Sequence, residues 1–293
     1  MKITPGPASK QLGQKVAEFL GVEAVPLFFK TYPDGESYVR LEGKVQNEEI
    51  AIVQTTSPPQ DTRLMQLALI ADAAKRHGAK KVTAVVPYLA YARQDRVFLQ
   101  GEAISINTVA NMLKVAGIDS LITVNVHQAK VLEKFPFPAK TISAIPLLAE
   151  YFKKKGFEKA FALAPDDGAL WLAEEAKSVL SGECGYLEKH RDLYTGQVTT
   201  EKKKLDVRGK TVIIFDDIIS TGGTIASAAK IMKEAGADKV YAACVHPLLI
   251  GDAEKRILES GVKEIVGTDS IPSHVSKVSL APLLSKELKN TKA

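Results

Sequence analysis

The chain alternates between short apolar runs and longer segments that carry apolar residues along one helical face. Runs of about four to six apolar residues are typical of strands buried on both faces of a parallel sheet. The helical segments end at glycine or basic residues, as between Leu64 and Gly78. The pattern predicts an α/β fold, with strands over 24–29, 49–54, 82–87, 121–126, 160–164, 185–188 and 212–215, and helices over 11–20, 64–76, 104–116, 145–155, 170–180 and from 225 to a stop at Gly236.

Two short stretches recur in the same order in the two halves of the chain. The segment 78–82, Gly-Ala-Lys-Lys-Val, resembles 236–240, and 116–119 resembles 260–263. Each of these segments precedes an apolar strand. A length of 293 residues accommodates two domains of ordinary size, and Phe-Pro-Phe-Pro at 135–138 is a candidate linker. We therefore expect two copies of one α/β unit, over residues 1–138 and 139–293.

The composition is that of an ordinary globular protein, with 45% apolar residues, 25% charged residues and a net charge of +5. No block of Lys and Arg marks a nucleic-acid-binding arm. The first residues contain no apolar signal core, and no apolar run approaches membrane length. Cys184 and Cys244 are isolated, so we expect both to be reduced and buried. These features predict a cytoplasmic protein with neither a nucleic-acid partner nor a membrane segment.

The most informative stretch is 211–224, TVIIFDDIISTGGT. A buried strand is expected to end before Asp216 and Asp217, and a glycine turn, Ser220 to Thr224, leads into a helix. This arrangement directs backbone N–H groups and the positive end of a helix at one point, which suits a phosphate group. Two carboxylates can accept hydrogen bonds from the paired hydroxyls of a sugar. Together they predict a site for ribose 5-phosphate.

Other polar segments allow an ordinary structural role as well as a ligand-binding one. The turn Tyr32-Pro33-Asp34-Gly35-Glu36 is either a surface turn or a place where an aromatic ring and two acids bind a nucleobase. Arg93 and Arg96 follow a strand end, where open α/β sheets bind ligands.

Three further segments also follow expected strands. His127 comes directly after one of them, and a lone histidine in that place is more often structural than a ligand. Asp166 and Asp167 either cap a helix or bind a magnesium–pyrophosphate complex. The polar loop from Lys189 to Gly196 is either a surface loop or an active-site lid.

The stretch 211–224 resembles the phosphoribosyl-binding loop of the type I phosphoribosyltransferase fold. The chain as a whole resembles the ribose-phosphate pyrophosphokinase (phosphoribosyl pyrophosphate synthetase) family, most closely its archaeal members, over essentially its full length. Six matches in order carry that resemblance: Tyr-Pro-Asp-Gly-Glu at 32–36, Tyr-Ala-Arg-Gln-Asp at 91–95, His127, Pro165-Asp166 with Gly168, Lys189 with Arg191, and 216–224. It implies two tandem domains of the type I phosphoribosyltransferase fold, each a mostly parallel sheet flanked by helices.

The resemblance also implies a role for each matched residue. ATP is expected to be bound by Tyr32, Asp34, Gly35, Glu36, Arg93, Gln94 and Asp95. Ribose 5-phosphate is expected to be bound by Arg191, Asp216, Asp217, Ser220, Thr221, Gly222, Gly223 and Thr224. Lys189 and Arg191 are the expected catalytic residues, and His127 and Asp166 the expected ligands of Mg²⁺. The family usually has Asp two residues before this histidine, whereas this chain has Asn125, which removes one carboxylate from the expected metal site.

The activity implied is the transfer of the β,γ-diphosphoryl group of ATP to the C1 hydroxyl of ribose 5-phosphate, which yields 5-phosphoribosyl 1-diphosphate and AMP. The implied assembly is a homodimer or a larger homo-oligomer. In it, the turn at Tyr32 reaches the ATP site of a neighbouring subunit. An exposed Tyr beside carboxylates, with little to pack on in its own domain, is consistent with that arrangement.

Three other functions are compatible with parts of the sequence. A phosphoribosyltransferase would share 216–224 but would not need the segments 32–36 and 93–95. A non-catalytic homologue would be expected to lack the Lys189 and Arg191 pair, which this chain has. A ligand-sensing DNA-binding protein would need an added helix-turn-helix or a basic surface, and neither is present in the sequence pattern.

Overall fold

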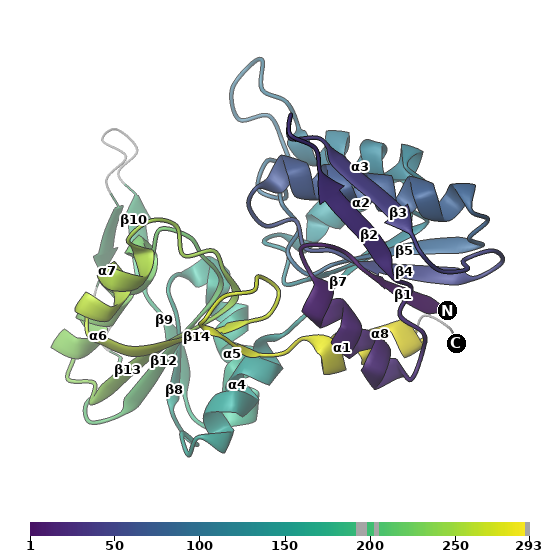
Figure 1. Ribbon diagram of the computed structural model, residues 1–293. Helices are drawn as coiled ribbons and strands as arrows, with labels where there is room; N and C mark the ends of the chain where they lie inside the picture. Colours follow the sequence, from purple (N-terminus) through teal and green to yellow (C-terminus); the bar gives the residue numbers. More distant parts are fainter. Residues whose placement is uncertain (192–197, 202–204, 291–293) are drawn as a thin grey trace. The chain divides into compact units, whose positions relative to one another are not determined.

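The computed structural model describes residues 1–191, 198–201 and 205–290 (Figure 1). The chain forms two compact units, and each is described by itself. Unit 1 consists of residues 1–143, 270–272 and 279–293, and unit 2 of residues 144–269 and 273–278. Among the residues described, no helix is both long and apolar enough to cross a membrane.

Unit 1 is built on a five-stranded sheet in the order β1-β4-β5-β6-β7. All of its strand pairs are parallel, as the buried apolar runs predict. Its elements are β1 (Lys2–Pro5), α1 (Lys10–Leu20), β2 (Leu27–Thr31), β3 (Ser37–Leu41), β4 (Glu49–Val53), α2 (Gln60–Arg76), β5 (Lys81–Val86), α3 (Ser105–Val115), β6 (Ser120–Val124), the 3₁₀ helix η1 (Ala129–Lys134), β7 (Ala139–Ile142) and α8 (Ala281–Asn290).

A two-stranded antiparallel hairpin, β2–β3, lies outside this sheet. Its inner apolar residues Leu27, Val39 and Leu41 pack against the core that α2 and the sheet share, and β3 runs along α2 (Figure 1). The turn of the hairpin, residues 32–36, is exposed, whereas its strands are anchored through apolar residues.

The expected linker at 135–138 is wrong. Phe135 and Phe137 are buried in the core of unit 1, with their rings 5.5 Å apart. The following strand β7 pairs with β6 in the same sheet. The boundary between the units falls after Ser143 rather than after residue 138, because β7 completes the first sheet.

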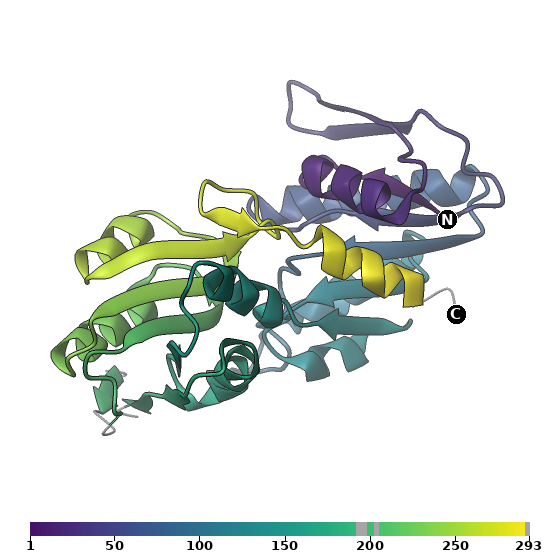
Figure 2. The same ribbon diagram turned by 90° about the horizontal axis from the view of Figure 1, so that it is seen from below.

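The end of the chain also differs from the expected division into 1–138 and 139–293. Helix α8 belongs to unit 1, where it lies beside α1 (Figures 1 and 2). The Ser285 hydroxyl donates a hydrogen bond to the Val16 carbonyl at 3.4 Å, and Lys140 pairs with Glu287. The apolar face of an amphipathic helix does not indicate which unit it packs on, so the sequence pattern could not assign this C-terminal helix to unit 1.

Unit 2 contains a six-stranded parallel sheet in the order β15-β14-β13-β12-β8-β9 and a separate antiparallel hairpin, β10–β11. Its elements are α4 (Ile145–Lys154), β8 (Phe161–Ala164), the 3₁₀ helix η2 (Asp167–Ala169), α5 (Leu170–Leu180), β9 (Cys184–Tyr186), β10 (Glu188–Arg191), β11 (Val198–Glu201), β12 (Thr211–Ile219), α6 (Gly223–Glu234), β13 (Lys239–Pro247), α7 (Ala253–Glu259), β14 (Val262–Thr268) and β15 (Ser276–Val278).

The central strand β12 has helices on both faces. Ile214 belongs to the core that contains Ala229 of α6 and Ile257 of α7, whereas the ring of Phe215 packs against Phe152 of α4. Neighbouring residues of a strand point to opposite faces, so both faces of the sheet are covered. Figure 2 shows this layered arrangement from below.

Two expectations for unit 2 are corrected in detail. Strand β12 does not end before the acids but continues to Ile219, because β13 is equally long and Ile219 pairs with Pro247. Asp216 and Asp217 therefore lie on the strand itself. Both cysteines are free, as expected, but Cys184 is half-buried while Cys244 is buried.

Candidate active site

The segment after β12 forms a glycine turn that leads directly into α6. Gly222 has a φ of 77° and precedes Gly223, the first residue of the helix. A Cβ atom at Gly222 would lie 2.9 Å from the carbonyl oxygen of Ala253 and 3.0 Å from the side chain of Ile257. The left-handed backbone and the close approach of α7 both require glycine at this position.

The start of α6 has the properties of an anion site. The first N–H groups of a helix have no acceptor within the helix, and no side chain caps α6. These groups and the positive helix end favour a phosphate at residues 220–224, which we call the phosphate loop. The glycine turn and the helix start that the sequence predicts are thus confirmed, whereas the phosphate itself stays a prediction.

Two carbonyl groups of the phosphate loop accept hydrogen bonds from residues that follow β13. Arg256 of α7 donates a hydrogen bond from Nη1 to the Thr221 carbonyl at 2.6 Å. The Ile250 N–H donates to the Ser220 carbonyl at 2.9 Å. These bonds use acceptors of the loop and leave its N–H donors for a ligand. Arg256 could not be predicted from the sequence, because it lies in an exposed helical segment 35 residues from its partner and no local pattern marks it.

Three carboxyl groups gather at the carboxyl ends of the neighbouring strands β8 and β12. The Asp217 N–H donates to Oδ1 of Asp216 at 2.9 Å. Asp166 follows β8, and its Oδ1 accepts a hydrogen bond from the Ala169 N–H at 3.2 Å. Burial, followed by the negative charge of Asp217 and its hydrogen bond, and then by the charge of Asp166, raises the pKa of Asp216 well above its usual range. The cluster therefore favours hydroxyl donors or a cation.

The two expected catalytic residues lie on β10, where the sequence analysis expected a loop. The backbone of Lys189 pairs with Thr200 of β11, and that of Arg191 with Val198. The side chains of Lys189 and Arg191 lie outside the described residues. Their catalytic roles therefore stay a prediction.

The turn of the β2–β3 hairpin is tightly hydrogen-bonded. The Tyr32 N–H donates to the Glu36 carbonyl at 2.8 Å, and the Glu36 N–H donates to Oδ1 of Asp34 at 3.2 Å. Gly35 has a φ of 98°, which the turn requires. The turn thus has a defined shape that presents Tyr32, Asp34 and Glu36 to solvent.

Tyr32 does have packing partners within its own unit, contrary to expectation. Its ring meets that of Tyr38 edge-on, with centroids 6.0 Å apart, and Nζ of Lys30 lies 4.3 Å from its ring centroid. The expectation that Tyr32 has little to pack on in its own domain is therefore wrong. Both partners lie on the strands of the same hairpin, a pairing that only the strand register reveals.

The segment 88–96, which we call the nucleotide loop because of its predicted role, follows β5. Arg93 is exposed, and it has no hydrogen bond or ion pair with any other residue that the structure describes. Gln94 is half-buried, and its Nε2 donates to Glu102 at 3.2 Å. Asp95 is half-buried. The loop thus offers an exposed guanidinium beside a constrained amide.

His127 is exposed after β6 and belongs to unit 1, whereas Asp166 belongs to unit 2. Asn125, which replaces the usual Asp of the family, is 2% exposed and has a φ of 36°. Its Nδ2 donates to the Ser143 hydroxyl at 3.5 Å. Asn tolerates positive φ better than most residues, so this residue suits its backbone conformation.

The carboxyl cluster of Asp166, Asp216 and Asp217 offers oxygen ligands of the kind that Mg²⁺ prefers. Hard carboxylate oxygens suit this ion, which usually binds one or two carboxylates together with substrate phosphates. In the described ranges, no group of three or more His, Cys, Asp or Glu residues is placed to hold a metal by itself. The residues present suit a Mg²⁺ ion that is bound together with a phosphorylated substrate. Asp166 is the ligand predicted in unit 2.

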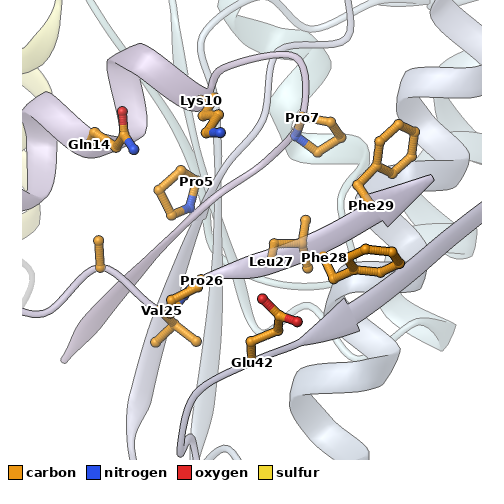
Figure 3. Close-up of a pocket in the computed structure, with 11 residues that line it drawn as sticks. Pro5, Pro7, Lys10, Gln14, Val25, Pro26, Leu27, Phe28, Phe29 and Glu42 are labelled. Atoms are coloured by element: carbon orange, nitrogen blue, oxygen red, sulfur yellow. The ribbon is translucent and has the colours of Figure 1, made fainter.

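A pocket of about 640 Å³ lies between α1 and the β2–β3 hairpin in unit 1 (Figure 3). Lys10 and Gln14 of α1 line one side, and Leu27, Phe28 and Phe29 line another. None of the residues predicted for substrate binding is among those that line it. We therefore assign it no part in the candidate site.

The predicted residues thus form two groups. Unit 2 brings together Asp166, the two acids of β12 and the phosphate loop. Unit 1 carries the hairpin turn, the nucleotide loop and His127.

Comparisons with known proteins match nearly the whole chain. Residues 1–117 match the family model described as the N-terminal domain of ribose phosphate pyrophosphokinase, and residues 199–286 match the phosphoribosyl synthetase-associated domain. The ribose-phosphate pyrophosphokinase of Methanothermobacter thermautotrophicus is 41% identical over 97% of this chain and 98% of its own length. That of Sulfurisphaera tokodaii is 41% identical over 98% of this chain and 100% of its own.

The fold agrees with these relatives. The crystal structure of phosphoribosylpyrophosphate synthetase from Mycobacterium smegmatis superposes with a TM-score of 0.87 at 31% identity, over 99% of this chain and 98% of that one. The family matches, the identity over nearly the full length and the shared architecture lead to one conclusion: the chain belongs to the ribose-phosphate pyrophosphokinase family.

Proposed function

We propose that this chain transfers the β,γ-diphosphoryl group of ATP to the C1 hydroxyl of ribose 5-phosphate, releasing AMP. The observation that carries the proposal is the phosphate loop beside the carboxyl groups of Asp216 and Asp217. Family membership supports the reaction, and the loop supports the acceptor substrate.

Ribose 5-phosphate is bound by its two ends. The backbone N–H groups at the start of α6 receive the 5-phosphate, with the Ser220, Thr221 and Thr224 side chains beside them and Arg191 as a further cation. Asp216 and Asp217 accept hydrogen bonds from the ribose hydroxyls. The raised pKa of Asp216 supports this role, because hydroxyl donors compensate the charge that the cluster holds unfavourably.

ATP is bound by unit 1 residues. The ring of Tyr32 stacks on the adenine, with Asp34 and Glu36 accepting hydrogen bonds from its amino group and Gly35 allowing the turn between them. Arg93, Gln94 and Asp95 bind the nucleotide from the nucleotide loop. The exposed guanidinium of Arg93 supports this role, because a planar cation suits phosphate oxygens.

Catalysis consists of positioning and charge neutralisation, since such transfers leave little covalent chemistry to the protein. Lys189 and Arg191 stabilise negative charge on the transferring group. His127 and Asp166 would hold Mg²⁺ on the phosphates, and the ion would polarise the phosphoryl oxygens when bound. The protein is proposed to act in the cytoplasm as a homo-oligomer, without nucleic acid or membrane partners.

The test is AMP release from purified protein supplied with ATP, Mg²⁺ and ribose 5-phosphate. We expect AMP and 5-phosphoribosyl 1-diphosphate in equal amounts, and no AMP when ribose 5-phosphate is omitted. Nucleobase plus 5-phosphoribosyl 1-diphosphate serves as the second substrate pair. Nucleotide formation from that pair without AMP release from ATP would identify a phosphoribosyltransferase instead.

A further inference from the structure

The two units use the same place in their fold in different ways. In unit 2, β12 is followed by the phosphate loop and α6; in unit 1, β4 is followed by residues 54–59, which we call the twin loop, and then by α2. The repeated segments at 78–82 and 236–240 make the two loops equivalent. The twin loop has no glycine turn, and Asp61 lies in the first turn of α2. A carboxylate there disfavours an anion.

The twin loop is instead bonded to the nucleotide loop. The Thr56 N–H and hydroxyl both donate to the Tyr88 carbonyl, at 3.0 and 2.7 Å. The Thr56 hydroxyl also accepts a hydrogen bond from the Ala90 N–H at 2.8 Å. Thr56 is fully buried. The first residues of the nucleotide loop are therefore fixed to the end of β4.

A second contact holds the next residue. The Tyr91 hydroxyl donates a hydrogen bond to Oδ1 of Asp61, at the start of α2. This bond, with burial and the negative charge of Asp61 as lesser causes, raises the pKa of Tyr91, so the hydroxyl stays protonated as the donor.

Tyr91 has a φ of 65°, a left-handed conformation that is unfavourable for a non-glycine residue. Such a conformation persists where its surroundings enforce it. The Gln94 N–H donates to the Tyr91 carbonyl at 3.3 Å, so the turn at Tyr91 sets the course of the chain through Arg93.

We propose that Asp61 is a positioning residue for ATP binding. Asp61 holds Tyr91 and thereby places Arg93. The proposal rests on the proposed function, because it takes ATP as the ligand of the nucleotide loop. Asp61 itself acts through the loop and not on the substrate. The twin loop thus holds the nucleotide loop in place in unit 1, whereas its counterpart in unit 2 is proposed to bind phosphate.

The test uses four single variants, one double variant and two separate measurements. Asp61→Leu and Tyr91→Phe each remove the hydrogen bond, while Asp61→Asn removes the charge and keeps an acceptor. Asp72→Leu is the matched control, because Asp72 lies on the same helix and makes an exposed pair with Arg76. ATP binding is measured by calorimetry without ribose 5-phosphate, and KM and kcat are measured by AMP release.

We expect Asp61→Leu and Tyr91→Phe each to weaken ATP binding by roughly fivefold to tenfold, the scale of one ordinary hydrogen bond. KM for ribose 5-phosphate should change by less than about twofold. Asp61→Asn should recover part of the loss, and combining Asp61→Leu with Tyr91→Phe should add little to either alone. Asp72→Leu should bind ATP like the unaltered protein.

Three results would overturn the proposal. They are an equal loss of affinity for both substrates with a lowered Tm, an Asp61→Asn protein as impaired as Asp61→Leu, or fully additive losses in the double variant. Failure of the proposed function has a different signature, because the unaltered protein would then bind ATP without releasing AMP. An unaltered protein that does not bind ATP would overturn both proposals.

Discussion

Arg256 donates a hydrogen bond from its guanidinium to the carbonyl of Thr221 at 2.6 Å, and so ties α7 to the phosphate loop. The bond fixes the course of the loop at Thr221 and places the positive charge of Arg256 beside the loop that is proposed to bind the 5-phosphate.

Replacing Arg256 with Gln is therefore expected to raise KM for ribose 5-phosphate by about fivefold to tenfold, the effect of losing one ordinary hydrogen bond at an exposed position. KM for ATP should stay near that of the unaltered protein. Lys255→Gln is the control, because this neighbouring cation pairs with Glu259 on the exposed side of α7. Equal effects of the two variants would mean that only the local charge matters.

Gly222→Ala is expected to be far more damaging than Gly209→Ala. Both glycines have positive φ, 77° and 71°, but a Cβ atom at Gly209 meets nothing within 4 Å, whereas at Gly222 it meets the backbone of α7. Gly209→Ala should cost about 1–2 kcal/mol for the left-handed backbone alone. Gly222→Ala should lower Tm further and abolish binding of ribose 5-phosphate. Similar Tm values for both variants would show that α7 moves away from the added Cβ atom at little cost in stability.

The stability of the ligand-free protein is expected to depend on the ionisation of Asp216. Its pKa is raised in the folded protein, so the folded state binds its proton more tightly than the unfolded state does. Its contribution to stability is present below the usual carboxyl pKa and is lost as pH rises through the raised value.

Asp216→Asn cannot ionise and should therefore unfold at a higher Tm than the unaltered protein at pH 8, with the difference shrinking toward pH 4. The same variant should bind ribose 5-phosphate more weakly while its affinity for ATP is retained. Calorimetry and thermal unfolding across this pH range provide both measurements. A Tm gain that is constant with pH would show that the pKa of Asp216 is not raised.

Lys189→Ala is expected to lower kcat by at least roughly a hundredfold, the scale of losing one preorganised electrostatic donor. Tm should hardly change, because the residue lies on the β10–β11 hairpin outside both sheets. A rise confined to KM for ATP would instead show that Lys189 binds the substrate equally in the ground state and the transition state.

A shared active site predicts complementation between subunits. Tyr32→Ala and Lys189→Ala, each nearly inactive, are dissociated and reassociated together. If Tyr32 serves the neighbouring subunit, each mixed dimer carries both defects in one site and none in the other. Random pairing should then restore about a quarter of the full activity.

A site built within one chain predicts no recovery of activity from that mixture. A tagged chain first confirms that subunits exchange under the conditions used.

The apolar runs were sufficient to predict the α/β class and the central strands of both sheets, because burial on both faces of a parallel sheet imposes a local pattern on those strands. The two acids and the glycine turn that follows them could also be predicted, because Asp216, Asp217 and Gly222 are close neighbours in the chain. The backbone requirement of that turn, a positive φ before a helix, is also local and calls for glycine.

Features that depend on contacts between distant segments were decided by the tertiary structure alone. The sheet partner of β7, the packing of α8 on α1 and the full length of β12 each follow from a neighbour far away in sequence. The same holds for Arg256 on Thr221 and for Asp61 on Tyr91, 30 residues apart. Hydrogen bonds between loops leave no periodicity in a sequence, because any polar residue of suitable reach can make them once the fold has brought it there.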